Sequence, residues 1–376
     1  MAAELTVAEA AQRVLGLLES GDLETGLTLA LALAEQCPDE MEILYVAGLA
    51  CWQAGRHAEA IGFQRRLIAC DPGNLEIRRN LVELFLRLDD QSGIIDAVDE
   101  AVEAGYEDPR MINAKGLAQY KLGDSAAALD TFRRVTELQA DFAKAYQNMS
   151  VVLMDQGDGE AAVEVYAKSL APWDGNLNDG AASEITSRYD ERAETYDETE
   201  LHRYFGRTMA AFILAFSRPE AQTRILDAAC GTGAVGHYLP RFEGALVGID
   251  ISPAMLDKAR SRGIYQELHV GDVVQVMCDL EGPFDMVTCC CALYHVADLT
   301  PFFEQASRLL VSGGYLFFSV DPATDEFDIA VSGEGEYAHS RKYLRGLAGR
   351  FDLDELEIRI MNHRMMPGFW VALQKS

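Results

Sequence analysis

The sequence Ile225-Leu-Asp227-Ala-Ala-Cys-Gly231-Thr-Gly233-Ala-Val-Gly236 decides the fold of the second half of the chain. It passes from an apolar run, through an acidic residue, into a turn with three glycines and then into a helical stretch. Glycine allows left-handed backbone conformations and a close approach of the backbone to a ligand. A strand that enters a helix through such a turn is typical of parallel sheets that bind a ligand at the turn.

The sequence on either side of this turn alternates in the same way. Short apolar runs are separated by amphipathic helical stretches, and this order predicts a doubly wound parallel sheet. Ligands of such sheets bind beyond the carboxyl ends of the strands. The predicted strands are 223–226, 245–249, 267–270, 284–291 and 315–320, and apolar runs at 356–361 and 368–374 predict a C-terminal hairpin.

Three acidic residues at the ends of the first three strands indicate the chemistry of the ligand. Asp227 lies four residues before Gly231, where a carboxylate disfavours a pyrophosphate and suits a ligand with an ammonium and a sulfonium group. Asp250 is placed to accept hydrogen bonds from ribose hydroxyls, and Asp272 suits an adenine amine. The glycines alone also match a dinucleotide fingerprint, so a nicotinamide enzyme remains an alternative.

These residues resemble the class I S-adenosylmethionine-dependent methyltransferases over about 185–376. The resemblance includes the glycine turn, the acidic residues, the strand that begins Phe284-Asp-Met-Val and the segment Leu309-Leu-Val-Ser-Gly-Gly314. Ala229 departs from it, because the family often has glycine there. The resemblance implies S-adenosyl-L-methionine as cofactor and S-adenosyl-L-homocysteine as product. The cofactor contacts that it implies are Tyr189, Tyr196, Asp227, Ala229, Gly231, Gly233, Asp250, Ile251, Asp272, Val273 and Cys291.

Tyr189 and Tyr196 precede the first strand and resemble the tyrosine-containing segment that folds over the cofactor in members acting on small molecules. Their alternative role is to pack the linker helix against the sheet.

Candidate residues for the acceptor side follow the fourth and fifth strands. Methyl transfer is an in-line displacement, so holding a nucleophile near the methyl group with water excluded supplies much of the catalysis. His295 can accept a proton or orient that nucleophile, and a structural role is its alternative. Tyr337 and His339 are further candidates because they lie in the segment 321–340. That segment is compatible with a substrate lid and with a solvated loop.

The adjacent cysteines Cys289, Cys290 and Cys291 lie in the fourth predicted strand. Successive strand residues alternate between faces, so the three thiols cannot bind one metal ion together. We predict buried strand positions here rather than a nucleophile. The acidic residues between 321 and 328 have the oxygen ligands that a divalent cation prefers, but such clusters are usually solvated, and we predict no metal.

A 34-residue repeat fills the first half of the chain. Units that start at residues 7, 41, 75, 109 and 143 keep register without a gap. The eighth and twentieth positions are small in most units, and the fifteenth position is glycine in all units but the third, which has Asp89. Each unit therefore predicts two closely packed antiparallel helices that are joined by a turn at the fifteenth position.

The units resemble the tetratricopeptide repeat, for example in Gly116, Gly123, Ala128 and Phe132 of the fourth unit. The resemblance implies a protein or peptide partner on the concave face formed by the first helix of each unit. Cationic and amide side chains at positions two, five and six predict a groove for an acidic segment, with ordinary solvated helix surface as the alternative. These side chains are Arg79, Asn80, Arg110, Asn113, Lys144 and Asn148.

The 376 residues include 32 Lys and Arg against 60 Asp and Glu, a net charge of −28. This acidity disfavours nucleic acid and anionic membranes as partners, because both attract clustered cations. No apolar run is long enough for a membrane span, and the first residues lack the pattern of a signal peptide. The eight cysteines are not spaced as a disulfide framework. We therefore expect a cytoplasmic protein.

Together these features predict a multidomain chain. It consists of an all-α tetratricopeptide solenoid at 1–176, a linker and helical cap at 177–222, and an α/β Rossmann-like doubly wound sheet at 223–376. The resemblances imply transfer of a methyl group to an oxygen or nitrogen nucleophile of a small molecule, or of a protein docked on the repeats. The alternative is a non-catalytic scaffold whose second domain senses S-adenosylmethionine.

Overall fold

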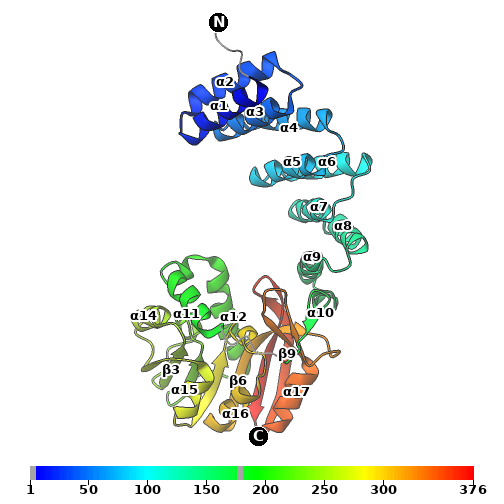
Figure 1. The fold of residues 1–376 in the computed structure, drawn as a ribbon. Coiled ribbons are helices and arrows are strands. Elements are labelled where there is room, and N and C mark those ends of the chain that lie inside the picture. Colours follow the sequence, from blue (N-terminus) through cyan, green and yellow to red (C-terminus); the bar gives the residue numbers. More distant parts are fainter. Residues whose placement is uncertain (1–5, 176–180) are drawn as a thin grey trace. The chain divides into compact units, whose positions relative to one another are not determined.

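The computed structural model describes residues 6–175 and 181–376, so most of the expected linker at 175–180 lies outside the described residues. The chain divides into two compact units, residues 1–140 and residues 141–376. The first unit consists of paired helices, and the second is built around a sheet with helices on both faces (Figure 1). No helix among the described residues is long and apolar enough to cross a membrane.

The helices of the first unit follow the predicted repeat. The first helices of the units begin at residues 7, 41, 75 and 109, as the 34-residue period predicts. The fifteenth position has a left-handed backbone in every unit, including the third, where Asp89 has a φ of 53° without the help of glycine. The helices are α1 (Val7–Glu19), α2 (Leu23–Gln36), α3 (Met41–Gln53), α4 (His57–Cys70), α5 (Leu75–Arg87), α6 (Gln91–Glu103), α7 (Pro109–Lys121) and α8 (Ser125–Leu138).

The small residue at the eighth position allows the two helices of a unit to pack closely. A Cβ atom on Gly116 of α7 would lie 2.6 Å from a ring carbon of Phe132 on α8. Phe132 is fully buried, so its ring has little room to move away. The glycine is therefore a packing requirement of this helix pair.

The sheet of the second unit has the predicted parallel arrangement. Its strand order is β1-β7-β8-β6-β5-β2-β3-β4, and β10 pairs with β6 and with β9. The five strands from β2 to β6 run parallel, and β9 and β10 form the predicted antiparallel hairpin. These strands are β2 (Arg224–Ala228), β3 (Ala245–Asp250), β4 (Glu267–Val270), β5 (Phe284–Cys289), β6 (Leu310–Ala323), β9 (Leu353–His363) and β10 (Met366–Lys375).

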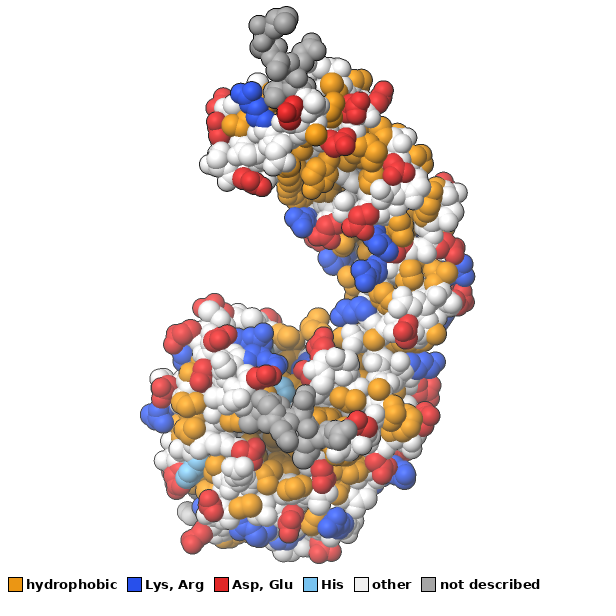
Figure 2. Space-filling view, viewed as in Figure 1, with side chains coloured by type: hydrophobic (Ala, Val, Ile, Leu, Met, Phe, Trp, Pro, Cys, Tyr) orange, Lys and Arg blue, Asp and Glu red, His pale blue; other side chains and the backbone are white. Residues whose placement is uncertain are grey.

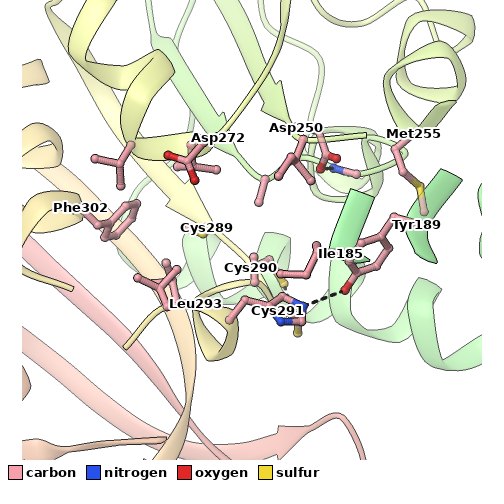
Figure 3. Close-up of a pocket in the computed structure, with 18 of the residues that line it drawn as sticks. Ile185, Tyr189, Asp250, Met255, Asp272, Cys289, Cys290, Cys291, Leu293 and Phe302 are labelled. Carbon is pink, nitrogen blue, oxygen red and sulfur yellow. Dashed lines mark hydrogen bonds between the residues drawn. The ribbon is translucent and has the colours of Figure 1, made fainter. Parts of the chain in front are cut away.

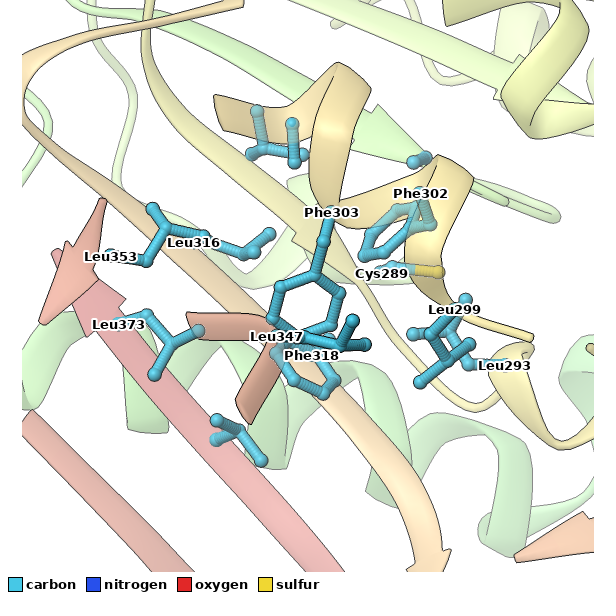
Figure 4. Close-up of a cluster of buried hydrophobic side chains, with 14 of the residues drawn as sticks. Cys289, Leu293, Leu299, Phe302, Phe303, Leu316, Phe318, Leu347, Leu353 and Leu373 are labelled. Atoms are coloured by element: carbon cyan, nitrogen blue, oxygen red, sulfur yellow. The ribbon is translucent and has the colours of Figure 1, made fainter. Parts of the chain in front are cut away.

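Apolar side chains cover both faces of this sheet. On one face, Phe302 and Phe303 of α16 (Thr300–Leu309) pack with Phe318 of β6 and with α17 (Arg341–Arg350), as Figure 4 shows. On the other face, α12 (Glu200–Phe216) packs against β6 and β10. The remaining helices of this unit include α11 (Ala181–Arg192), α13 (Ala234–Tyr238), α14 (Pro253–Ser261) and α15 (Val273–Asp279), with short 3-10 turns η1 (Tyr196–Glu198) and η2 (Leu293–His295).

The fifth repeat unit packs with the sheet. Its helices α9 (Ala143–Asp155) and α10 (Gly159–Ala167) belong to residues 141–376 and contact β6 and β10. Val163 of α10 lies in the main core of the sheet, and Glu160 pairs with Arg341 at 2.8 Å. A Cβ atom on Gly159 would lie 3.0 Å from the side chain of Ile360 on β9. The repeat pattern thus continues to about residue 174, whereas the packing divides the chain at residue 140.

The segment 321–340 differs from the expected loop. Strand β6 continues to Ala323, and β7 (Ile329–Val331) and β8 (Tyr337–Ser340) add to the sheet, with β1 (Ala171–Pro172) on β7. The lid and the solvated loop both assumed a segment without strands, whereas β8 pairs with β6 and β7 pairs with β8 and β1. Ser340 caps α17 by accepting a hydrogen bond from the Tyr343 N–H at 3.1 Å.

Candidate cofactor and active site

A cavity of about 490 Å³ lies at the carboxyl ends of the parallel strands of the second unit. Strands β2, β3 and β5 each end at it, and α11 covers it from the other side (Figure 3). This is the position that the sequence predicts for a ligand. Predicted cofactor residues that line it are Tyr189, Tyr196, Ala229, Gly231, Asp250, Ile251, Asp272, Val273 and Cys291.

The glycine turn after β2 forms one wall of the cavity. Ala229, Gly231 and Gly233 all have positive φ angles, of 58°, 54° and 82°. Gly233 does not line the cavity, but a Cβ atom there would lie 2.7 Å from the ring of Tyr265. Ala229 adopts the left-handed conformation in spite of its methyl group. The methyl group at this position therefore does not prevent the turn from forming.

Asp250 joins the glycine turn to the end of β3. Its two carboxylate oxygens accept hydrogen bonds from the backbone N–H of Gly231 at 2.8 Å and of Ser252 at 2.9 Å. Burial raises the pKa of the Asp250 carboxyl, and these two backbone donors act in the opposite direction. A carboxylate oxygen has further lone pairs after one hydrogen bond. Asp250 can therefore accept hydrogen bonds from a ligand in the cavity.

Asp227 lies behind the cavity wall. It is buried and does not line the cavity, and its Oδ2 atom accepts a hydrogen bond from the Tyr265 hydroxyl at 2.6 Å. Burial raises the pKa of Asp227 to about 7, although the bond from Tyr265 lowers it. Its Oδ1 atom has no partner among the described groups. The structure thus places Asp227 next to the other predicted cofactor residues but not in the cavity.

Asp272 and the residues around it form the wall beyond β4. The Asp272 side chain is exposed and caps α15 by accepting a hydrogen bond from the Gln275 N–H at 3.0 Å. Val273 lies beside it on the cavity, and Ile251 lines the wall next to Asp250. Two apolar side chains next to a carboxylate suit a flat heteroaromatic ring with an amine at its edge.

Two tyrosines from the segment before β2 close the cavity. The hydroxyl oxygen of Tyr189 on α11 lies 2.9 Å from that of Tyr294 and 3.4 Å from Nε2 of His295, the contact drawn in Figure 3. Tyr196 stacks on His202 with ring centroids 3.7 Å apart. Burial raises the pKa of both Tyr189 and Tyr196, so both hydroxyls stay protonated near neutral pH.

Two acidic residues that were not predicted hold this cap on the sheet. Asp190 accepts a hydrogen bond from the Ser252 hydroxyl at 2.5 Å, next to Asp250. Asp197 accepts one from the Thr232 hydroxyl at 2.7 Å and pairs with Arg262 at 2.6 Å. Each follows a predicted tyrosine in the sequence. The cap therefore rests on the two loops that also form the cavity wall.

His295 lies where the sequence predicts it, on η2 after β5. It lines the cavity beside the Tyr189 hydroxyl. Burial, with the positive charges of Arg364 and Arg188, lowers the pKa of His295 to about 4. The ring is therefore neutral at neutral pH, and a neutral imidazole can accept a proton.

His339 and Tyr337 lie outside the cavity lining, on β8. His339 is fully buried, and its Nε2 atom lies 2.9 Å from the Ala297 carbonyl oxygen. Burial lowers the pKa of His339 to about 4. Tyr337 is also buried, near Trp173. From this position His339 supports the segment after His295. Neither His339 nor Tyr337 contacts the cavity.

All three adjacent cysteines line the cavity. Strand β5 ends at Cys289, so the expectation that Cys290 and Cys291 are strand positions was wrong. The chain turns after the strand, and Cys291 has a φ of 53°. All eight cysteines are free thiols. Among the described residues no group of three His, Cys, Asp or Glu side chains is arranged for a metal ion.

The cationic and amide side chains predicted for partner binding fall on both units. Asn80 lines a groove of about 570 Å³ over α1, α3, α4 and α5 of the first unit. Arg79 pairs with the buried Asp108 at 2.5 Å, and Arg110 is exposed. Asn113 is half-buried on α7. In the second unit, Lys144 is exposed and Asn148 is buried.

Several residues of the cavity were missed by the sequence analysis because they are apolar and come from separate elements. Their pattern is that of ordinary core residues, so no sequence motif distinguishes them. They are Ile185, Met255, Val274, Leu293, Val296 and Phe302.

Comparisons with known proteins agree with this organisation. A family model described as a methyltransferase domain matches residues 226–318. A tetratricopeptide repeat model matches residues 12–74, 95–142 and 113–176. The ubiquinone biosynthesis O-methyltransferase of Xanthomonas oryzae pv. oryzae (strain PXO99A) is 36% identical over 118 residues, 30% of this chain and 49% of that protein. The chain thus spans about half the length of the curated relatives it matches.

Two solved structures are similar to parts of the chain at low sequence identity. The Burkholderia thailandensis 1,6-didemethyltoxoflavin-N1-methyltransferase is similar over 55% of this chain and 95% of its own, with 16% identity and a TM-score of 0.44. The tetratricopeptide repeat protein YrrB is similar over 43% of this chain and 84% of its own, with 20% identity and a TM-score of 0.34. From the family matches, the chain combines an array of tetratricopeptide repeats with a methyltransferase domain.

Proposed function

We propose that the protein is a class I S-adenosylmethionine-dependent methyltransferase, and that the cavity at the ends of β2, β3 and β5 holds the cofactor. The observation that carries the proposal is Asp250, a buried carboxylate at the cavity wall that two backbone donors fix in place. Such a carboxylate suits the ribose hydroxyls of the cofactor, and Asp272 with Val273 and Ile251 suits its adenine.

The residues on the remaining walls fit the cofactor's reactive end. When bound, S-adenosylmethionine supplies an electrophilic methyl group on a positively charged sulfur. The turn from Ala229 to Gly231 lies at the cavity, and Tyr189 and Tyr196 line the cavity from the segment before β2. A bound cofactor would therefore be enclosed between the glycine turn and these two tyrosines.

The acceptor in this proposal is an oxygen or nitrogen nucleophile. His295 is neutral and can accept the acceptor's proton at one ring nitrogen, while Tyr189 holds the ring. Apolar side chains such as Leu293 and Phe302 favour a small molecule with apolar bulk. The curated relatives named as O-methyltransferases support oxygen as the accepting atom.

The repeats serve as a partner-binding module in this proposal. The groove over α1, α3, α4 and α5 is largely apolar, and its open rim includes the exposed Tyr45. Figure 2 shows hydrophobic side chains on the surface of the first helix pairs. An extended peptide fits such a groove, with Asn80 and Gln64 as hydrogen-bonding partners. A protein held there is the second class of methyl acceptor. A cytoplasmic location is part of the proposal.

The proposal is tested by the cofactor affinity of the Asp250→Ala variant. The variant loses charged hydrogen bonds to the cofactor that are worth about 1.5–3 kcal/mol. We therefore expect S-adenosylhomocysteine to bind the variant roughly tenfold to a hundredfold more weakly than the wild-type protein, as measured by titration calorimetry. The matched control is Asp257→Ala on α14, where the carboxylate is exposed and pairs with Arg260. Equal affinities of the wild-type protein and Asp250→Ala would overturn the proposal. Binding without methyl transfer to any acceptor would favour the non-catalytic scaffold.

A further inference from the structure

A buried tyrosine behind the cavity wall contacts the helix that covers the cavity. Tyr294 lies on η2 next to His295, is buried, and does not line the cavity. Its hydroxyl oxygen lies 2.9 Å from that of Tyr189 on α11, so the two hydroxyls share a hydrogen bond. The Tyr189 hydroxyl also lies 3.4 Å from Nε2 of His295. Tyr294 thus connects the covering helix α11 to the segment that follows β5.

Arg364 holds the ring of Tyr294. Its guanidinium carbon lies 3.6 Å from the centre of the ring, which is a close cation–π contact. The guanidinium pairs with Glu336, and its Nη1 atom lies 3.9 Å from Oδ2 of Asp321. Two carboxylates therefore restrain the arginine, and the arginine restrains the ring whose hydroxyl contacts Tyr189.

The turn that carries Arg364 is itself fixed by the fold. Arg364 and Met365 join β9 to β10 with positive φ angles of 55° and 71°. Nδ1 of the preceding His363 lies 2.6 Å from Oδ1 of Asp321, and both side chains are buried. A Cβ atom on Gly368 would lie 2.1 Å from Cβ of His363, so the glycine leaves space for this histidine. A left-handed turn next to a buried pair gives Arg364 one defined position.

We propose that Tyr294 is a positioning residue of the methyltransferase site: its hydroxyl holds Tyr189 over the cavity, and Arg364 holds its ring. The inference rests on the proposed function, because the ligand that Tyr189 encloses is taken to be the cofactor. Removal of the Tyr294 hydroxyl leaves the Tyr189 hydroxyl with one contact fewer on the sheet side. The bound cofactor should then escape faster, whereas its entry should be unaffected.

The test measures the dissociation of S-adenosylhomocysteine from the full chain by stopped-flow displacement. Tyr294→Phe keeps the ring on Arg364 and removes only the hydroxyl. Since a lost hydrogen bond acts mainly on dissociation, we expect release to be roughly threefold to tenfold faster and association to change by less than about twofold. Tyr343→Phe is the matched control, because its hydroxyl contacts Asp298 at 2.9 Å and does not line the cavity. Equal dissociation rates of Tyr294→Phe and the wild-type protein would overturn the proposal.

A double-mutant cycle separates positioning from a general loss of stability. Tyr189→Phe and Tyr294→Phe remove the two ends of one hydrogen bond, so the double variant should release S-adenosylhomocysteine no faster than the faster single variant. Two single effects that multiply in the double variant would contradict a direct action of Tyr294 on Tyr189.

Hydrogen exchange of α11 in the free protein tests the contact without any ligand. Backbone amides of α11 should exchange faster in Tyr294→Phe than in the wild-type protein or Tyr343→Phe. If Tyr294→Phe does not fold, Tyr189→Phe removes the same hydrogen bond from the covering helix and takes its place. A wild-type protein that binds no S-adenosylhomocysteine would refute the proposed function, whereas unchanged exchange of α11 would refute the positioning role of Tyr294.

Discussion

At the scale of single residues, burial gives three histidines of the second unit different chemistry. Burial lowers the pKa of both His295 and His339 to about 4. His363 is as fully buried as His339, but the nearby Cys291 and Asp321 side chains raise its pKa to about 10. The neutral His295 beside the cavity is thus suited to accept a hydrogen bond, whereas His363 is suited to stabilise an anion.

These shifts make the contributions of the three histidines to the stability of the second unit depend on pH. The pKa values of His295 and His339 lie below the unfolded value of about 6.5, so the unfolded state binds more protons and stability falls as the pH drops from 6.5 toward 4. The pKa of His363 lies above that value, so its contribution is complete below pH 6.5 and is lost as the pH rises toward 10.

Urea unfolding of the wild-type protein and of His363→Gln at pH 5, 7 and 9 isolates the contribution of His363. A chain with Trp52→Phe removes the tryptophan of the first unit, so the signal comes from the second unit, which contains the buried Trp370. The loss of unfolding free energy caused by His363→Gln should be larger at pH 7 than at pH 9, because the raised pKa of His363 stabilises the folded state most below that pKa. An equal or larger loss at pH 9 would contradict this assignment.

At the scale of elements, local patterns were predictable and non-local pairing was not. The 34-residue period predicted the first residue of the first helix in each unit, because each helix pair is built from residues that are neighbours in the sequence. The left-handed backbone of Asp89 shows that the turn between the helices forms even without glycine. The segment 321–340 was expected as a lid or a loop because it is rich in Gly, Asp and Glu, whereas it contains the short strands β7 and β8. Their stability depends on β6 and β1, which lie elsewhere in the sequence.

The close contact between α7 and α8 predicts a large cost for one methyl group. Gly116→Ala places a Cβ atom 2.6 Å from the buried ring of Phe132, so we expect a loss of about 1–3 kcal/mol from overpacking. Gly62→Ala on α4 is the matched control, because a Cβ atom there meets nothing within 4 Å. It should be neutral or stabilise by up to about 1 kcal/mol through helix propensity.

Urea unfolding of the first unit compares the two variants. Equal midpoints for Gly116→Ala and Gly62→Ala would show that the helix pair can move apart without cost.

At the scale of the whole molecule, the sequence repeat and the packing divide the chain at different places. The period continues to about residue 174, but α9 and α10 pack on β6 and β10 as part of residues 141–376. The repeat pattern predicts the helices of each unit. It does not predict that the last helix pair, α9 and α10, packs on the sheet. The predicted boundary at 176 therefore remains to be tested against the boundary at 140.

Two truncated chains make that test. A chain that begins at Asp141 keeps Val163 and Tyr166 buried against the sheet and should keep the stability of the second unit. A chain that begins at residue 177 lacks α9 and α10, so it exposes the side chains that pack against Val163 and Tyr166. Each large side chain that is no longer buried costs roughly 1.5–3 kcal/mol of stability. This chain should therefore unfold at a lower urea concentration or aggregate. Equal unfolding midpoints of the two chains would place the boundary at 176.

The candidate site was predictable where its residues directly follow successive parallel strands. It was not predictable where strands that are distant in the sequence come together. Gly231, Asp250 and Asp272 follow from their spacing after successive strands, and all three line the cavity. His363 and Asp321 are 42 residues apart and meet only through the order of β6, β10 and β9. A single sequence contains no pattern that brings such residues together, so their contact appears only in the folded chain.

The central claim is that the cavity supports methyl transfer. The most direct measurement incubates the full chain with methyl-labelled S-adenosylmethionine and a size-fractionated extract of host cells, with Asp250→Ala as the blank. We predict label above the blank, in the small-molecule fraction if the acceptor enters the cavity free, or in protein if the repeats deliver it. No label above the blank, from a wild-type protein that binds S-adenosylhomocysteine, would contradict the account.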